Sequence, residues 1–249
     1  ILIGRDAQID TASLVMSTLD IKDGDFTAGH YKFEGTATSG TITNHGYIKS
    51  APNGEIILIA PSIINAPEVG NENSGLIESE NGDLILAAGF GITISSLDDP
   101  DVSFEVQAPE NEVINLGRLL AQGGTASVLA GTIKHSGEIN ADSLSVDEQG
   151  RIVLVASSRI ETSADSVISA RGETLTNDEI DVAAVEPDAN VPERINPLGA
   201  DGGEVIIRAM AADADDTGRV SVGETQIELA GRIDVTGTMG GKTSVEADS

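Results

Sequence analysis

A two-part phrase that recurs along the chain constrains the fold more than any other feature. Its first part is a glycine, an aliphatic residue and a small residue at alternate positions, as at Gly46–Ser50 and Gly75–Ser79. Its second part is a glycine followed by alternating apolar residues that end in alanine, as at Gly54–Ala60 and Gly82–Ala88. A period of two is typical of a β-strand with one buried face. A repeat of about 20 residues built from such strands predicts one coil of a solenoid.

Two small residue types occupy fixed places in this phrase. The second part ends in alanine in six copies, which predicts an inward column too narrow for branched side chains: Ala60, Ala88, Ala130, Ala156, Ala209 and Ala247. The first part begins at a corner glycine, where we expect positive φ: Gly46, Gly75, Gly117, Gly137 and Gly231. Because parallel crossovers are right-handed in nearly all proteins, the fold class predicted is all-β, a right-handed parallel β-helix with surface loop or hairpin insertions.

Asparagines and histidines stand beside the corners. Asn44 and Asn115 precede the first part of the phrase, and we place Asn65 at the same corner. Stacked asparagines at such a corner predict a hydrogen-bonded ladder. The three histidines are far apart in sequence and are predicted to lie on the surface rather than at a metal site: His30, His45 and His135.

The outward positions of the second part are apolar in its first four copies, except at Ser127. They are Ile57 and Ile59, Ile85 and Ala87, Ser127 and Leu129, and Val153 and Val155. A bare apolar stripe would be an interaction patch, and we predict instead that a hairpin outside the coils covers it. Phe26, Tyr31 and Phe33 cluster around Gly29, which predicts a hairpin or lip packed against the coils.

The repeats predict a single continuous β-helix fragment over residues 1–249. Four irregular segments interrupt the period, at 65–74, 96–112, 173–200 and 211–225. The predicted parts are N-terminal coils with the aromatic lip (1–38), regular coils (39–172), an acidic proline-containing insertion (173–200) and further coils (201–249). Neither end looks like a capping coil, so we expect a piece of a longer protein.

Charge and composition exclude several classes. The net charge of −27, from 41 acidic and 14 basic residues, excludes electrostatic binding of nucleic acid and disfavours anionic membrane surfaces. The absence of cysteine removes disulfides, thiol catalysis and zinc–thiolate sites. No apolar run reaches 18 residues, so no membrane insertion is predicted, and no signal peptide is visible.

Acidic clusters are the strongest candidates for chemistry. Two groups stand in the irregular segments: Asp98, Asp99 and Asp101, then Asp213, Asp215 and Asp216. Neither matches an EF-hand or a calcium-binding nonapeptide repeat, so we interpret them as solvated loop acids, with calcium as the alternative and catalysis as the weakest one. No Ser-His-Asp set, phosphate-binding loop or Rossmann fingerprint is present. The sequence therefore predicts no catalytic residue and no cofactor.

Several segments together resemble a known family. They are Ile1–Gly4, Leu14–Ile21, Asp25–Phe33, Asn44–Ile48, Gly82–Ala88 and Val113–Leu119. In this order they resemble the N-terminal region of filamentous-haemagglutinin-type exoproteins of two-partner secretion, over nearly the whole chain. Two departures stand out. The Asn-Pro-Asn-Gly segment of that family, used in recognition by the outer-membrane partner, would precede Ile1, and the glycine expected soon after Asn65 is delayed to Gly75.

The resemblance implies a non-enzymatic shaft of a large secreted bacterial adhesin that serves attachment and biofilm cohesion. It implies export through the periplasm and an outer-membrane transporter to the cell surface or medium, and a receptor on host cells, matrix or biofilm polysaccharide. The same scaffold precedes many C-terminal activities, so the stalk of a contact-dependent toxin or haemolysin stays open. A filament whose subunits stack end to end also stays open, and a polysaccharide lyase or glycosidase has the least support.

Overall fold

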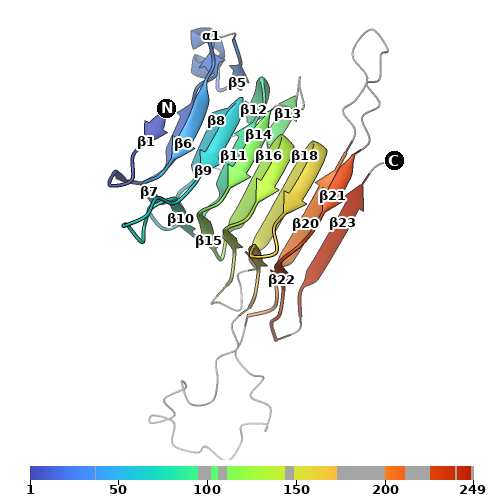
Figure 1. The fold of residues 1–249 in the computed structure, drawn as a ribbon. Coiled ribbons are helices and arrows are strands. Elements are labelled where there is room, and N and C mark those ends of the chain that lie inside the picture. Colours follow the sequence, from blue (N-terminus) through green and yellow to red (C-terminus); the bar gives the residue numbers. More distant parts are fainter. Residues whose placement is uncertain are drawn as a thin grey trace, which may run out of the picture.

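The computed structural model describes residues 1–36, 38–94, 102–105, 111–143, 149–172, 200–210, 225–238 and 240–247, with the backbone alone described at 102–105. Within these ranges the protein is all-β with one five-residue helix, and its two larger sheets are parallel. Figure 1 shows the strands side by side, with the colours following the sequence from one end of the row to the other. The all-β, parallel class predicted from the sequence is confirmed, and the arrangement is β-helix-like.

Sheet A contains 12 described strands. They are β1 (Leu2–Ile3), β3 (Leu14–Ser17), β6 (Thr41–Asn44), β8 (Ile56–Ala60), β9 (Ser62–Asn65), β11 (Leu84–Ala88), β14 (Glu112–Asn115), β16 (Thr125–His135), β18 (Arg151–Thr162), β20 (Glu204–Ala209), β21 (Gln226–Glu228) and β23 (Lys242–Ala247). The long strands β16 and β18 pair with a register shift between Ala130 and Thr132. The first part of β16 pairs with the row β3-β8-β11 and its last part with the row β1-β6-β9-β14, so the long strands join both rows into one sheet.

Sheet B contains seven described strands in sequence order. They are β2 (Gln8–Thr11), β7 (Tyr47–Ser50), β10 (Leu76–Glu80), β15 (Arg118–Gln122), β17 (Glu138–Asn140), β19 (Val167–Ser169) and β22 (Arg232–Asp234). The parallel register places the aliphatic residue of one copy of the phrase on that of the next: Ile48 on Ile77, Ile77 on Leu119, and Leu119 on Ile139. Successive copies therefore stack directly on one another.

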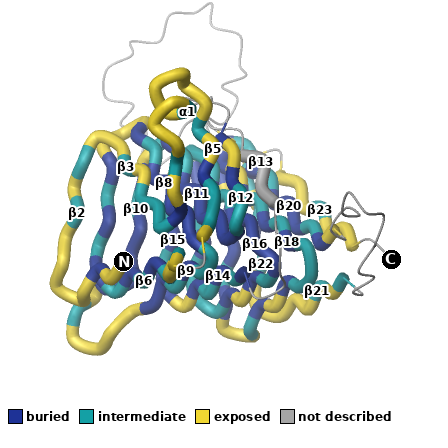
Figure 2. The backbone as a smooth tube through the Cα atoms, turned by 90° about the horizontal axis from the view of Figure 1, so that it is seen from above, coloured by how far each residue is buried: buried dark blue, intermediate teal, exposed yellow. Residues whose placement is uncertain are grey.

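The core runs through the inside of the coils. One cluster of buried aliphatic side chains extends from Ile3 to Ile207 and draws on both sheets. Figure 2 shows these buried stretches along the length of the molecule. Since one coil cannot bury its inward row alone, the coils above and below supply the missing contacts.

A small antiparallel sheet lies outside the coils. It is made of β4 (Asp20–Ile21), β5 (Tyr31–Glu34), β12 (Gly91–Ile94) and β13 (Val102–Glu105), in the order β13-β12-β5-β4. Its buried residues Phe33, Ile92 and Ile94 form a second core with the outward side chains of β8, β11 and β16. The predicted cover over the apolar stripe is thus confirmed for those three strands, whereas Val153 and Val155 on β18 stay half-buried.

The aromatic lip forms part of this covering sheet. Residues Asp23–Thr27 form the helix α1, and β5 follows it (Figure 1). Phe33 is 6% exposed and packs into the second core, whereas Phe26 is 56% exposed. The lip therefore packs through Phe33, and the largely exposed helix α1 stands out from the covering sheet (Figure 2).

Candidate functional site

The predicted corner asparagines lie in one column of sheet A. The register pairs Asn44 with Asn65 and Asn65 with Asn115, and all three are buried. Asn44 donates through Nδ2 to Asn65 Oδ1 at 2.9 Å, and Asn65 donates through Nδ2 to Asn115 Oδ1 at 2.9 Å. The delayed Gly75 still closes this corner, since its carbonyl accepts from Asn65 Nδ2 at 3.0 Å. The three amides therefore form a continuous hydrogen-bonded ladder.

The ladder continues into a histidine that we expected on the surface. His135 is 2% exposed and pairs in register with Asn115, so the surface prediction is wrong for this residue. Its Nδ1 lies 3.2 Å from Asn115 Nδ2 and its Nε2 lies 3.3 Å from the carbonyl oxygen of Val167. Burial lowers the pKa of His135. His45 is half-buried and His30 is exposed.

The corner positions require glycine for two different reasons. Gly75 and Gly231 have φ of +64° and +89°, as expected for such corners. Gly46, Gly117 and Gly137 do not have positive φ, so that prediction is wrong for them. At Gly137 an added Cβ would lie 2.0 Å from the carbonyl oxygen of Gly117 in the preceding coil. Close approach of neighbouring coils, rather than backbone conformation, requires glycine there.

At the start of the second part of the phrase, too, close approach of the neighbouring copy explains the glycine. Positive φ falls one residue earlier, at Asn53 (61°) and Asn81 (56°). Gly54 and Gly82 themselves have ordinary φ, and a Cβ on Gly82 would lie 2.1 Å from the carbonyl oxygen of Gly54. The backbone turns at the asparagine, and the glycine lets the next coil approach.

The predicted alanine column follows the register of sheet A. Ala60 pairs with Ala88, Ala130 with Ala156, and Ala156 with Ala209. These five alanines are fully buried. Ala247 pairs with Ala209 but is exposed, because β23 is the last strand of sheet A that the structure describes.

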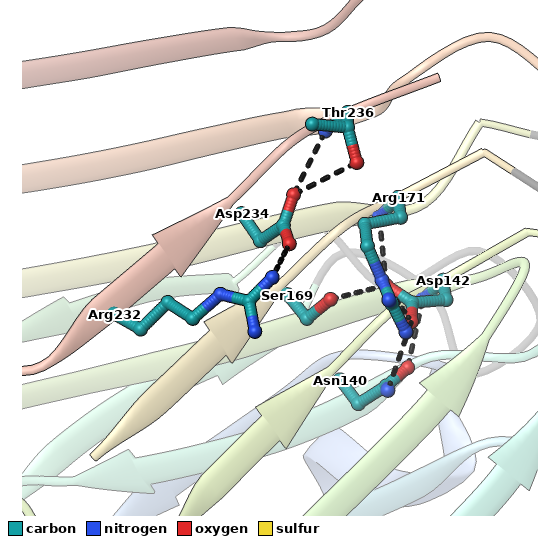
Figure 3. A network of polar contacts seen from close by, with 7 residues as sticks. All are labelled: Asn140, Asp142, Ser169, Arg171, Arg232, Asp234 and Thr236. Atoms are coloured by element: carbon teal, nitrogen blue, oxygen red, sulfur yellow. Dashed lines mark hydrogen bonds and ion pairs between the residues drawn. The ribbon is translucent and has the colours of Figure 1, made fainter. Parts of the chain in front are cut away.

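A polar network on sheet B was not anticipated from the sequence (Figure 3). The Asp142 carboxylate accepts from Ser169 Oγ at 2.6 Å, from Arg171 Nη2 at 2.8 Å and from Asn140 Nδ2 at 3.1 Å. Asp234 accepts from Arg232 and from Thr236 Oγ1, the latter at 2.9 Å. Both carboxylates are nearly buried and held by arginine, so neither is a free base. The Asp142 group links successive copies of the phrase through Ser169 and Arg171, whereas the side-chain bonds of Asp234 stay within its own segment.

A simple signal would have revealed this network. Asn140 and Asp142 stand three and five residues after Gly137, and Asp234 and Thr236 stand three and five after Gly231. The coil between them begins at Ser166 instead of glycine, and its Ser169 and Arg171 occupy the same two offsets. Because serine replaces the corner glycine, this copy of the phrase does not show the Gly-x-apolar pattern.

Replacing Asp234 with asparagine is expected to cost about 1–2 kcal/mol of stability at neutral pH, because the ion pair with Arg232 is lost. Burial alone would raise the pKa of Asp234, but the bonds from Thr236 and Arg232 outweigh it and the pKa is lowered. The stabilisation is therefore present above the ordinary pKa of about 4 and disappears as the pH falls through the lowered value. Urea denaturation at pH 7 and at pH 2–3 checks this, and an equal difference at both values would contradict it.

A second charged group lies on the outer face of sheet B near the N-terminal coils. Glu78 accepts from Tyr47 Oη at 2.6 Å and pairs with Lys49 Nζ at 3.1 Å. Burial, with help from Glu78, raises the pKa of Tyr47, and the two donors outweigh burial to lower the pKa of Glu78. The phenol therefore stays protonated and acts as a hydrogen-bond donor between β7 and β10.

The covering sheet carries a shallow hollow of about 390 Å³. Its lining residues are Asp25, Gly29, His30, Tyr31, Lys32, Thr93 and Ile94. The rings of Phe26 and Tyr31 meet edge to face beside it, with centroids 6.0 Å apart. This is a surface feature of the lip, with aromatic and charged groups together.

The calcium candidates lie outside the described residues, both at Asp98, Asp99 and Asp101 and at Asp213, Asp215 and Asp216. Among the residues that are described, no group of three or more His, Asp or Glu side chains is arranged to hold a metal ion. In the same part of the chain, no helix is long and apolar enough to cross a membrane.

Comparison with solved structures gives an informative likeness. No protein-family model matches the chain, and no curated protein matches it. The crystal structure of the HMW1 secretion domain from Haemophilus influenzae is similar, with 31% sequence identity and a TM-score of 0.72 over 97% of this chain. This chain spans 53% of that structure. The likeness supports a relationship to a secretion domain and does not single out filamentous haemagglutinin.

Proposed function

We propose that this chain is the secretion-domain region of a two-partner-secretion exoprotein, a non-enzymatic scaffold exported by an outer-membrane transporter. The observation that carries the proposal is the likeness to the HMW1 secretion domain, which extends over 97% of the chain. The sequence segments that resemble two-partner exoproteins point to the same class of protein.

The physical properties of the chain fit export in an unfolded form. It has no cysteine that would need to be oxidised, and its net charge of −27 favours solubility before folding. Neighbouring copies of the phrase pair in parallel register, as at β7, β10 and β15. A chain that leaves a pore from one end can therefore fold coil by coil, each coil serving as the template for the next.

At finer detail, we assign the region to the base of a secreted adhesin shaft at the cell surface or in the medium. The four parts proposed from the sequence then belong to one right-handed solenoid, with the acidic segment 173–200 as an insertion. The partners are the transporter and a receptor on host cells, matrix or biofilm polysaccharide. Polar groups that are paired to each other on the outer face of sheet B suit a structural shaft better than a reaction centre.

Secretion provides the direct test. The parent exoprotein is produced in a Gram-negative host with and without its transporter, and a matched form lacks residues 1–249. We expect the intact protein in the medium only when the transporter is present, and the deleted form in the periplasm. Secretion of the deleted form at the normal level would contradict the proposal.

Attachment provides the second test. Deletion of the parent gene is expected to reduce surface attachment or biofilm cohesion, and unchanged attachment would refute the adhesin assignment while leaving the secretion role intact.

A further inference from the structure

The corner ladder changes from amide to imidazole at one rung. We propose that His135 is a proton-sensitive rung, and that protonation of its imidazole breaks the ladder between β14 and β18 and loosens the coils stacked there. The inference concerns a property of the folded stack that the secretion role does not require.

The ladder fixes which tautomer His135 adopts. Asn115 Oδ1 accepts from Asn65 Nδ2 at 2.9 Å, so the Asn115 amide turns its NH₂ group toward the histidine. His135 Nδ1, 3.2 Å from Asn115 Nδ2, must then accept a hydrogen bond. Nε2 lies 3.3 Å from the carbonyl oxygen of Val167 and carries the proton. Only the neutral imidazole satisfies both contacts.

Protonation would place two donors against each other. An imidazolium carries a proton on Nδ1 as well as on Nε2, so its Nδ1–H would face the NH₂ group of Asn115. Asn115 cannot turn its amide around without breaking its bond with Asn65. The mismatch therefore spreads along the ladder instead of staying at one residue.

Within the described part of the chain, no charged group faces His135 to stabilise the cation. The charged side chains on the strands packed around it are Glu112 on β14, Lys134 on β16, Arg151, Arg159 and Glu161 on β18, and Glu138 on β17. The alternation of each strand directs them away from the inward side on which His135 lies, and Lys134 pairs with Glu112 at 3.0 Å. β19 carries no charged residue, and Asp165 in the turn before it is exposed. Burial accordingly lowers the pKa of His135.

The effect of acid at this rung is opposite to the general trend. With a net charge of −27, mild acidification reduces the repulsion within the folded chain and should favour it. His135 acts the other way, because the unfolded chain binds the proton more readily than the folded one. Stability from this residue is complete above the unfolded pKa of about 6.5 and falls as the pH drops below it.

A variant comparison isolates this contribution. His135→Asn replaces the imidazole with an amide that can continue the ladder and cannot titrate, and His30→Asn changes an exposed histidine as the matched control. Between pH 7.5 and 5.0, the unfolding equilibrium of the unmodified chain should shift toward the unfolded state relative to His135→Asn by up to about 30-fold, the limit set by an unfolded pKa of about 6.5. The His30→Asn variant should follow the unmodified chain.

Titration of the unmodified chain by nitrogen-15 NMR decides the matter even if the variant does not fold. We expect His135 to show the Nε2–H tautomer and to stay neutral below the ordinary imidazole pKa of about 6.5. Amide-exchange protection factors near the ends of β16 and β18 should fall on acidification more than those in β8 and β11. Parallel pH profiles for the unmodified chain and His135→Asn, or protonation of His135 at the ordinary imidazole pKa of about 6.5, would overturn the proposal.

Discussion

Replacement of Gly82 with alanine is expected to destabilise the protein by more than about 3 kcal/mol, beyond the usual cost of overpacking. An added Cβ would lie 2.1 Å from the carbonyl oxygen of Gly54 and 2.5 Å from Ser79 Oγ. The serine side chain can rotate, but the Gly54 carbonyl belongs to the backbone of the neighbouring coil. Ser79 Oγ also donates to that carbonyl at 2.7 Å, which holds the two coils at this spacing. Relief of the clash therefore requires the coils to separate.

Gly40→Ala is the matched control. A Cβ on Gly40 meets nothing within 4 Å, and its φ is ordinary. Its substitution should change the free energy of unfolding by less than about 1 kcal/mol and in the stabilising direction, because alanine lowers the entropy of the unfolded chain. Urea denaturation followed by far-ultraviolet circular dichroism measures both. If Gly82→Ala unfolds at the same urea concentration as Gly40→Ala, the close stacking described here is wrong.

The glycines also show what the sequence could and could not reveal. Their regular spacing predicted strands, a shared face and parallel stacking, since an alternating pattern is a local property of the chain. The reason for each glycine was not local. At Gly137 and Gly82 it depends on a carbonyl of the preceding coil, which the sequence does not display. Positive φ was the nearest local explanation, and it holds for Gly75 and Gly231.

The ladder illustrates the same limit. Its rungs are separated by 21, 50 and 20 residues, because insertions of different length lie between the coils. The gap of 50 residues conceals the step from Asn65 to Asn115. His135, in contrast, stands two residues before Gly137, as Asn115 stands two before Gly117, so the sequence does place it in the same column. Its burial was missed because the rung is a histidine and not a third copy of the Asn-x-Gly pattern.

The covering sheet shows how much the pattern of apolar residues can predict. Apolar outward positions on β8 and β11 indicated that something must cover them, because an exposed stripe of that size is unfavourable. Which segments do so could not be predicted, since β5 and β12 are about 60 residues apart and pair antiparallel. The polar network on sheet B was missed for a simpler reason, the substitution of Ser166 for a corner glycine.

Replacement of Asn65 with alanine is expected to cost about 2–5 kcal/mol, because it orphans buried groups on both sides. Asn44 Nδ2 loses its acceptor, and Asn115 Oδ1 loses its donor. The carbonyl of Gly75 loses the bond from Asn65 and keeps the one from the backbone nitrogen of Arg118. Asn44 and Asn115 are buried, and each buried polar atom left unpaired costs about 1–3 kcal/mol.

Asn44→Ala provides the graded comparison for this middle rung. Asn44 has one neighbour in the ladder, Asn65, and otherwise accepts from the backbone nitrogen of Gly46 at 3.0 Å. Its loss should therefore cost roughly half as much as that of Asn65. The denaturation curves are measured at pH 7.5, where His135 is neutral, so that the fourth rung is the same in both variants. If the two substitutions cost the same, the amides act as independent caps of their own corners, and the ladder does not transmit stability from coil to coil.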